Sequence, residues 1–164
     1  MTCRNIVSCL VLVISVVAAC SANAQQEAST ACTFDDGKQI TVKYQSVPAT
    51  HKLPDDRIWS PGKSPMFLFT SGALKLGNVD VPVGAYSMFV VPGKDRWTLV
   101  LNKNVAPNAH YDEQEDLLRV PMDLGTLSEP AKTVGIYFGH VAPKQCNMRI
   151  YYGTTGAWAE FHEE

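Results

Sequence analysis

The feature that most constrains the fold is a pair of apolar segments between Val83 and Asn102, joined by a short turn. Gly84–Val91 and Arg96–Asn102 each have the length of a strand, and Pro92-Gly93-Lys94-Asp95 between them favours a tight turn. Successive side chains of a strand point to opposite faces. Both faces are apolar here, with Tyr86, Met88 and Val90 on one face, Phe89 and Val91 on the other, and Trp97, Leu99 and Leu101 aligned on the return strand. The pattern predicts a central antiparallel hairpin that is covered on both faces in a two-layer packing.

Similar patterns recur along the chain. Asp35-Asp36-Gly37 is a turn signal between Thr30–Phe34 and Lys38–Tyr44, in which Ile40, Val42 and Tyr44 alternate with polar residues. Further expected strands are Met66–Leu76, Leu117–Leu124, Ala131–Gly139, Gln145–Tyr152 and Ala157–His162. We therefore predict an all-β fold with little helix, an antiparallel β-sandwich of about nine or ten short strands. A closed β-barrel is the alternative.

The first 24 residues have the pattern of an export signal. Arg4 is followed by the almost unbroken apolar run Ile6–Ala19, and Ala22-Asn23-Ala24 offers small residues at the positions that a signal peptidase reads. The apolar run is well below the ~20 residues of a membrane-spanning helix. We predict a signal peptide over residues 1–24, a linker over 25–33 and a single β-sandwich domain over 34–164, in an extracytoplasmic (periplasmic or secreted) protein.

A second interpretation of residues 1–24 leads to a different mature protein. Val17-Ala18-Ala19-Cys20 has the pattern of a bacterial lipobox, in which the cysteine is lipidated and becomes the mature N-terminus. Cleavage before Cys20 gives a protein anchored to the membrane through lipid, whereas cleavage after Ala24 gives a soluble one. Membrane attachment is expected only through this possible anchor.

Two cysteines remain after removal of the signal, Cys32 and Cys146. In a small extracytoplasmic domain two cysteines are usually paired, so we predict a disulfide between them. The bridge would close a loop of over a hundred residues. A catalytic redox pair is not indicated, because there is no Cys-x-x-Cys spacing.

Charge and motifs indicate no specific chemistry. The net charge is −2 with no basic stripe, so nucleic acid is not an expected partner. His110 with Asp112 and His140 is the nearest approach to a metal or acid–base set, but exposed loop histidines are the simpler interpretation. We interpret the acidic cluster, Asp112, Glu113, Glu115 and Asp116, as a solvated loop or helix start. No catalytic, metal-binding or cofactor-binding residue is assigned.

Four aromatic residues, Trp59, Tyr151, Tyr152 and Trp158, are candidates for a surface that stacks on sugar rings or on a partner protein. Tyr151 and Tyr152 point to opposite faces of a strand, so at most one of them can join such a surface. Core packing is the simpler interpretation of these side chains.

Several motifs resemble the Domain of Unknown Function 2911 family. They are Val81–Phe89, Pro92-Gly93, Trp97–Lys103, Tyr111-Asp112, Asp116–Val120 and Leu127–Pro130, within a match of roughly Lys38 to Phe161. The resemblance implies an exported bacterial protein, in a family whose function is not established. Family members often carry Trp-Arg-Thr-Gly-Ala-Asn-Glu-Ala ahead of the third strand, where this chain has Trp59–Met66. Trp59 and Gly62 remain, but the Arg, Asn and Glu are absent, so an activity that needs those residues is not expected here.

These observations favour a non-catalytic binding or structural module of the bacterial envelope, with an unknown envelope partner or small ligand. An envelope enzyme of unrecognised type is one alternative, and it requires His110 or His140 to lie with carboxylates in a pocket. A carrier with an apolar cavity between two sheets is the other.

Overall fold

A computed structural model describes residues 26–106 and 110–164 of the chain. The described part is built almost entirely of strands, with two single turns of 3-10 helix. The elements are β1 (Gln26–Thr33), β2 (Gln39–Ser46), η1 (Pro61–Lys63), β3 (Met66–Thr70), β4 (Leu74–Leu76), β5 (Val79–Val81), β6 (Gly84–Val91), β7 (Trp97–Asn102), η2 (Glu113–Glu115), β8 (Asp116–Ala142) and β9 (Gln145–Glu163). Among these residues no helix is long and apolar enough to cross a membrane.

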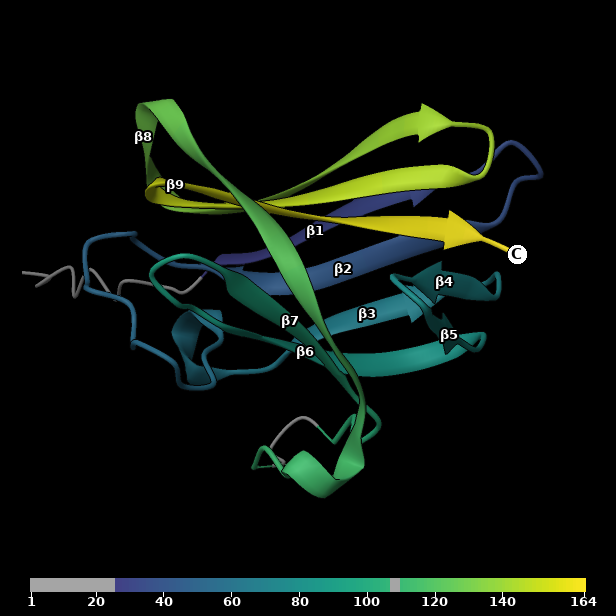
Figure 1. Cartoon of the computed structure of the whole chain (residues 1–164), viewed down its shortest axis with the longest axis horizontal. Helices are drawn as coiled ribbons and strands as arrows, with labels where there is room; N and C mark the ends of the chain where they lie inside the picture. Colours follow the sequence, from purple (N-terminus) through teal and green to yellow (C-terminus); the bar gives the residue numbers. More distant parts are fainter. Residues whose placement is uncertain (1–25, 107–109) are drawn as a thin grey trace, which may run out of the picture.

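The strands form one open antiparallel sheet in the order β1-β2-β3-β6-β7-β8-β9-β4-β5. The long strand β8 belongs to both halves of this sheet, because Asp116–Met122 pairs with β7 and the rest pairs with β9 from Asp123 onward. In Figure 1, β8 crosses the molecule diagonally from the lower to the upper part of the sheet. The predicted all-β antiparallel fold is confirmed, and the alternative of a closed barrel is wrong.

A single apolar core lies between the two halves of the sheet. The predicted alternation is confirmed in β2, where Ile40, Val42 and Tyr44 are buried. The Tyr44 hydroxyl accepts a hydrogen bond of 3.1 Å from the backbone N–H of Ile136 in β8, which joins the two halves. The β6–β7 hairpin is central as expected, since Phe89 and Val100 on its outer face are buried as well as its inner face.

Several predicted boundaries are wrong. Residues 25–33, expected to be a linker, include β1, which pairs with β2 along its full length. Met66–Leu76 is divided into β3 and β4, because the chain turns at Ser71-Gly72 and leaves β3 to pair with β9. The four strands expected between Leu117 and His162 form only two, β8 and β9, and the short β5 was not predicted. The expected signal peptide and Cys20 lie outside the described residues.

The disulfide expected between Cys32 and Cys146 is present, with the two Cα atoms 6.3 Å apart. It joins β1 at one edge of the sheet to β9 in the other half, across 114 positions of sequence. Both cysteines are buried within the core cluster. The bridge therefore fixes an edge strand to the opposite half of the molecule.

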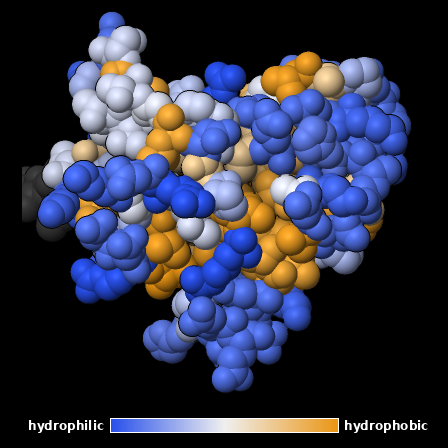
Figure 2. Space-filling model, viewed as in Figure 1, coloured by the Kyte–Doolittle hydropathy of each residue, from blue (hydrophilic) through white to orange (hydrophobic). Residues whose placement is uncertain are grey.

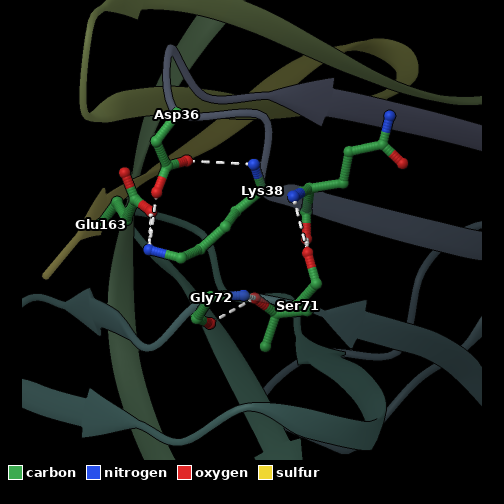
Figure 3. Close-up of polar contacts among 7 residues, drawn as sticks. Asp36, Lys38, Ser71, Gly72 and Glu163 are labelled. Carbon is green, nitrogen blue, oxygen red and sulfur yellow. Dashed lines mark hydrogen bonds and ion pairs between the residues drawn. The ribbon is translucent and has the colours of Figure 1, made fainter.

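Lys38, in the turn just before β2, also connects the two halves of the sheet (Figure 3). The Lys38 ammonium lies 2.8 Å from the Glu163 carboxylate at the end of β9 and 2.6 Å from the Asp36 carboxylate. The Glu163 side chain is only 1% exposed, whereas Lys38 and Asp36 are partly open to solvent. Lys38 therefore pairs with a buried carboxylate that would otherwise carry an unpaired charge. An unpaired buried charge is strongly destabilising.

The contact between Asp36 and Lys38 leads us to expect that the free energy of unfolding falls in acid. The hydrogen bond from the Lys38 ammonium is the main reason that the pKa of Asp36 is lowered to about 2 from an ordinary value of 3.8. A carboxyl whose pKa is lowered by folding stabilises the protein above its unfolded pKa, and this contribution is lost as pH falls through the folded pKa. We expect the difference in free energy of unfolding between the wild type and Asp36→Asn to shrink as pH falls from about 4 to 2.

Urea denaturation at intervals from pH 6 to pH 2 measures this difference, with Asn78→Ala at an exposed turn position as the matched control, because neither of its side chains titrates. The control should differ from the wild type by a constant amount over the range. A difference for Asp36→Asn that stays equally constant would contradict the role given to the Lys38 contact.

Candidate functional site

The outer face of the β8–β9 ribbon carries an aromatic surface. In β9 the residues Met148, Ile150 and Tyr152 are buried in the core, so that Arg149 and Tyr151 between them point outward. After the left-handed Gly153, the inward residues are Ala157, Ala159 and Phe161, and Trp158 lies on the outer face. Tyr137 of β8, directly opposite Arg149, is 52% exposed on the same face.

Glycines allow two of these rings, those of Trp158 and Tyr137, to lie against the sheet. A Cβ atom at Gly125 would come within 2.9 Å of the Trp158 ring, and one at Gly135 within 2.6 Å of the Tyr137 ring. A Cβ at Gly156 would lie 3.5 Å from the Tyr151 ring, which is an ordinary contact, so this ring does not depend on the glycine. Because Gly125 and Gly135 have no side chain, the Trp158 and Tyr137 rings can approach the backbone closely. Gly125 and Gly156 also face each other across the two strands.

This surface contains a hollow of about 340 Å³. Its lining combines apolar and hydrogen-bonding groups: Gly125, Thr126, Leu127, Asn147, Arg149, Tyr151, Gly156 and Trp158. Asn147 is only 7% exposed, and its side-chain oxygen accepts a 3.0 Å hydrogen bond from Nε of Arg149. This bond fixes the orientation of Arg149 and leaves the terminal guanidinium nitrogens for a ligand. We call these eight residues the ribbon hollow.

The structure brings together only part of the predicted aromatic surface. Tyr151 and Trp158 both line the ribbon hollow. Tyr152 instead faces inward and packs edge-on against Trp59, with 5.5 Å between ring centres. The expectation that only one of the two adjacent tyrosines joins the surface is met. Sequence reasoning missed Tyr137, Asn147 and Arg149, although their alternation with buried residues was a usable signal.

A second hollow, of about 270 Å³, lies on the outer face of β6 above Phe89. Its lining is Ile58, Trp59, Ser60, Lys63, Pro65, Phe89, His110 and Tyr111. Ser60 and Pro65, two positions at which the sequence departs from the pattern expected of the family that it resembles, both line this hollow. In Figure 2, hydrophobic surface is visible in the middle of the molecule. It lies above the hydrophilic lobe that carries η2 in Figure 1.

A polar cluster beside this second hollow is centred on Asp116. Its carboxylate accepts hydrogen bonds from the Asn102 amide at 2.8 Å, the Tyr111 hydroxyl at 2.7 Å and Nε of Arg119 at 2.8 Å. The Arg119 guanidinium also donates to the Tyr111 hydroxyl. Burial, followed by the bond to Asp116, raises the pKa of Tyr111 to about 12. These bonds hold Tyr111 in place against Phe89, on which its ring packs edge-on.

The acidic cluster is only in part a solvated helix start. Glu113 and Glu115 are exposed on η2, and the Asp112 side chain caps it by accepting a 3.0 Å hydrogen bond from the N–H of Gln114. Asp116 differs, since its side chain is mostly buried in the polar cluster just described.

The candidate acid–base set of His110, Asp112 and His140 is not assembled in a pocket. His110 lines the second hollow, whose lining includes no carboxylate. His140 is exposed, with its Nε2 atom 3.3 Å from the Asp35 carboxylate at the β1–β2 turn. Among residues 26–106 and 110–164, no three His, Cys, Asp or Glu side chains come together in an arrangement that could hold a metal ion.

The fold and these hollows define a small, disulfide-linked, all-β domain with open sites on the outer faces of its sheet. Its sequence assigns it further: the chain belongs to the family described as proteins of unknown function, DUF2911, whose sequence model matches residues 25–161. No curated protein and no solved structure matches the chain significantly. The resemblance expected from the motifs is thereby confirmed.

Proposed function

We propose that this protein is an exported, non-catalytic binding module that binds carbohydrate in the ribbon hollow. The observation that carries the proposal is that the Trp158 and Tyr151 side chains line one hollow together, with the Trp158 ring lying close over Gly125. A sugar ring has an apolar face of C–H groups and an edge of hydroxyls. It therefore matches a site that pairs aromatic surface with a few fixed polar groups.

The polar groups of the hollow suit hydroxyl recognition. The Asn147 amide is held by Arg149 and is largely removed from water, so it is already oriented before a ligand arrives. Preorganised polar groups lose little conformational entropy on binding. The hollow of about 340 Å³ has the size of a small-ligand site.

The lining supports binding and not cleavage of a glycan. Hydrolysis of a glycosidic bond ordinarily uses two carboxyl groups on opposite sides of the bond. The ribbon hollow is lined by neither Asp nor Glu, and its titratable groups are Arg149 and Tyr151. We therefore propose that the ribbon hollow binds a glycan without cleaving it.

Export is part of the proposal and is supported by the pattern of residues 1–24 and by the disulfide, which is typical of oxidising compartments. We propose cleavage after Ala24, with cleavage before Cys20 and lipid attachment as the alternative outcome. Intact mass of protein from separated soluble and membrane fractions of a bacterial host distinguishes a chain beginning at Gln25 from an acylated one beginning at Cys20. An unprocessed chain in the cytoplasm would contradict export.

Replacing Trp158 by alanine is expected to weaken carbohydrate binding about thirtyfold, the loss typical of an aromatic residue at the centre of a binding site. Affinity gel electrophoresis against a panel of bacterial and plant polysaccharides measures the binding. Phe69→Ala is the matched control, because this exposed ring lies on β3, outside the ribbon hollow. Retardation by at least one polysaccharide, abolished in Trp158→Ala and retained in Phe69→Ala, supports the proposal. Wild-type protein that is retarded by none would refute it.

A further inference from the structure

The ribbon hollow has one formally charged lining residue, Arg149. Its guanidinium is exposed at one end of the hollow, opposite Tyr137, and its Nε is held by the Asn147 oxygen at 3.0 Å. Arginine that is fixed through Nε presents its remaining nitrogens as a planar fork, a geometry that matches a carboxylate bidentately. Within the described residues no carboxylate forms an ion pair with Arg149, since the ion pairs found there involve other basic side chains.

Two carboxylates lie next to Trp158, beside the hollow but outside its lining. Asp123 is the direct cross-strand neighbour of Trp158, and Glu160 follows Trp158 on the same outer face of β9. Both carboxylates are exposed. His162, which also lies on this face, is 3.7 Å from Glu160. An anionic ligand group is therefore attracted to the Arg149 end and repelled from the Trp158 end, which gives the hollow a direction.

We infer that the carbohydrate bound in the ribbon hollow is acidic, with a ring carboxylate held by Arg149 while the sugar face stacks on Tyr151 and Trp158. This inference rests on the proposed function and adds to it the chemical class of the ligand, a uronic-acid-type sugar. It also adds Arg149 as the residue that determines specificity. Asn147 positions Arg149 and is not itself required to contact the carboxylate.

The test compares each acidic glycan with its own neutral form. Polygalacturonate, alginate and a glucuronan are used beside the same polymers after chemical reduction of their carboxylates to hydroxymethyl groups, which keeps the linkages. Isothermal titration of oligosaccharides from each pair is carried out at low ionic strength, since an exposed ion pair weakens as salt is added. We expect at least one acidic form to bind about tenfold or more tightly than its reduced form.

Variants assign the preference to Arg149. Arg149→Gln is expected to remove the tenfold preference, so that the acidic and reduced forms of a glycan bind with equal affinity, and Arg149→Lys to restore only part of the preference, because lysine lacks the planar fork. Arg57→Gln, at an exposed arginine outside the hollow, is the matched control and should retain the preference.

The two levels of the proposal fail differently. If acidic and reduced forms bind equally and both are lost in Trp158→Ala, the carbohydrate site stands and the inference of an acidic ligand is overturned. If the preference persists in Arg149→Gln, the assignment to Arg149 is overturned. If neither form of any pair binds and the wider panel also fails, the proposed function fails with it.

Discussion

Removal of the Cys32–Cys146 disulfide is expected to lower the free energy of unfolding by about 3–5 kcal/mol. The bridge spans 114 positions, so cutting it releases a long constraint on the unfolded chain, and the chain-entropy relation gives about 4–5 kcal/mol as an upper guide. The structure adds a local reason. Strand β1 lies at the edge of the sheet with β2 as its one hydrogen-bonded neighbour, and the disulfide is its covalent tie to the other half.

Urea denaturation of the wild type, with and without reductant, measures the effect against the double variant Cys32→Ser/Cys146→Ser. The double variant should match the reduced wild type and should not respond to reductant. Hydrogen exchange should show faster exchange in β1 than in β6 and β7 once the bridge is absent, because edge strands open locally. A wild-type midpoint that reductant leaves unchanged would contradict the stabilising role of the bridge.

The elements that could be predicted from sequence are those whose signals are local. The β6–β7 hairpin has apolar alternation on both sides of a turn motif, and the structure places its strands within one or two residues of expectation. The β1–β2 hairpin was recognised by Asp35-Asp36-Gly37, where Gly37 has the positive φ of 87° that the turn requires. The start of β1 was missed because Gln26–Ser29 is polar and small, and its strand conformation depends on pairing with β2.

The length of β8 and β9 could not be predicted because residues that usually interrupt strands are accommodated within them. Gly125 and Pro130 indicate a connection, yet β8 continues through both, with shifts of register between Thr126 and Gly135. Gly153 is similarly absorbed in β9 with a φ of 55°. These irregularities bend the ribbon without ending it, as bulges do.

The ribbon hollow depends on the same irregular register. Tyr151 and Trp158 were candidates from sequence, but their glycine partners could be recognised only once Gly125 was known to lie opposite Gly156. Arg149 and Asn147 gave no motif, since their importance comes from a hydrogen bond between neighbours on one strand face. Prediction from sequence therefore identified the aromatic half of the site and missed its polar half.

Replacement of Phe161 by alanine is expected to lower the free energy of unfolding by about 3–5 kcal/mol, as for other fully buried phenylalanines. Phe161 is 0% exposed, packs edge-on against Phe138 of β8 at 6.3 Å between ring centres, and lies opposite Leu76 of β4. Its ring thus connects three strands. Truncation leaves a cavity where β4 joins β9, and this pairing is how the β4–β5 hairpin joins the sheet.

Thermal and urea denaturation measure the loss, with Phe69→Ala as the control because that ring is 39% exposed on the outer face of β3. The control should cost less than about 1 kcal/mol, in keeping with its partial burial. Equal losses for the two variants would contradict the assignment of Phe161 to the core. Phe161→Ala and Trp158→Ala together separate stability from binding, since Phe161 faces inward and Trp158 outward on the same strand, β9. At temperatures where Phe161→Ala remains folded, it should therefore keep the carbohydrate affinity that Trp158→Ala loses.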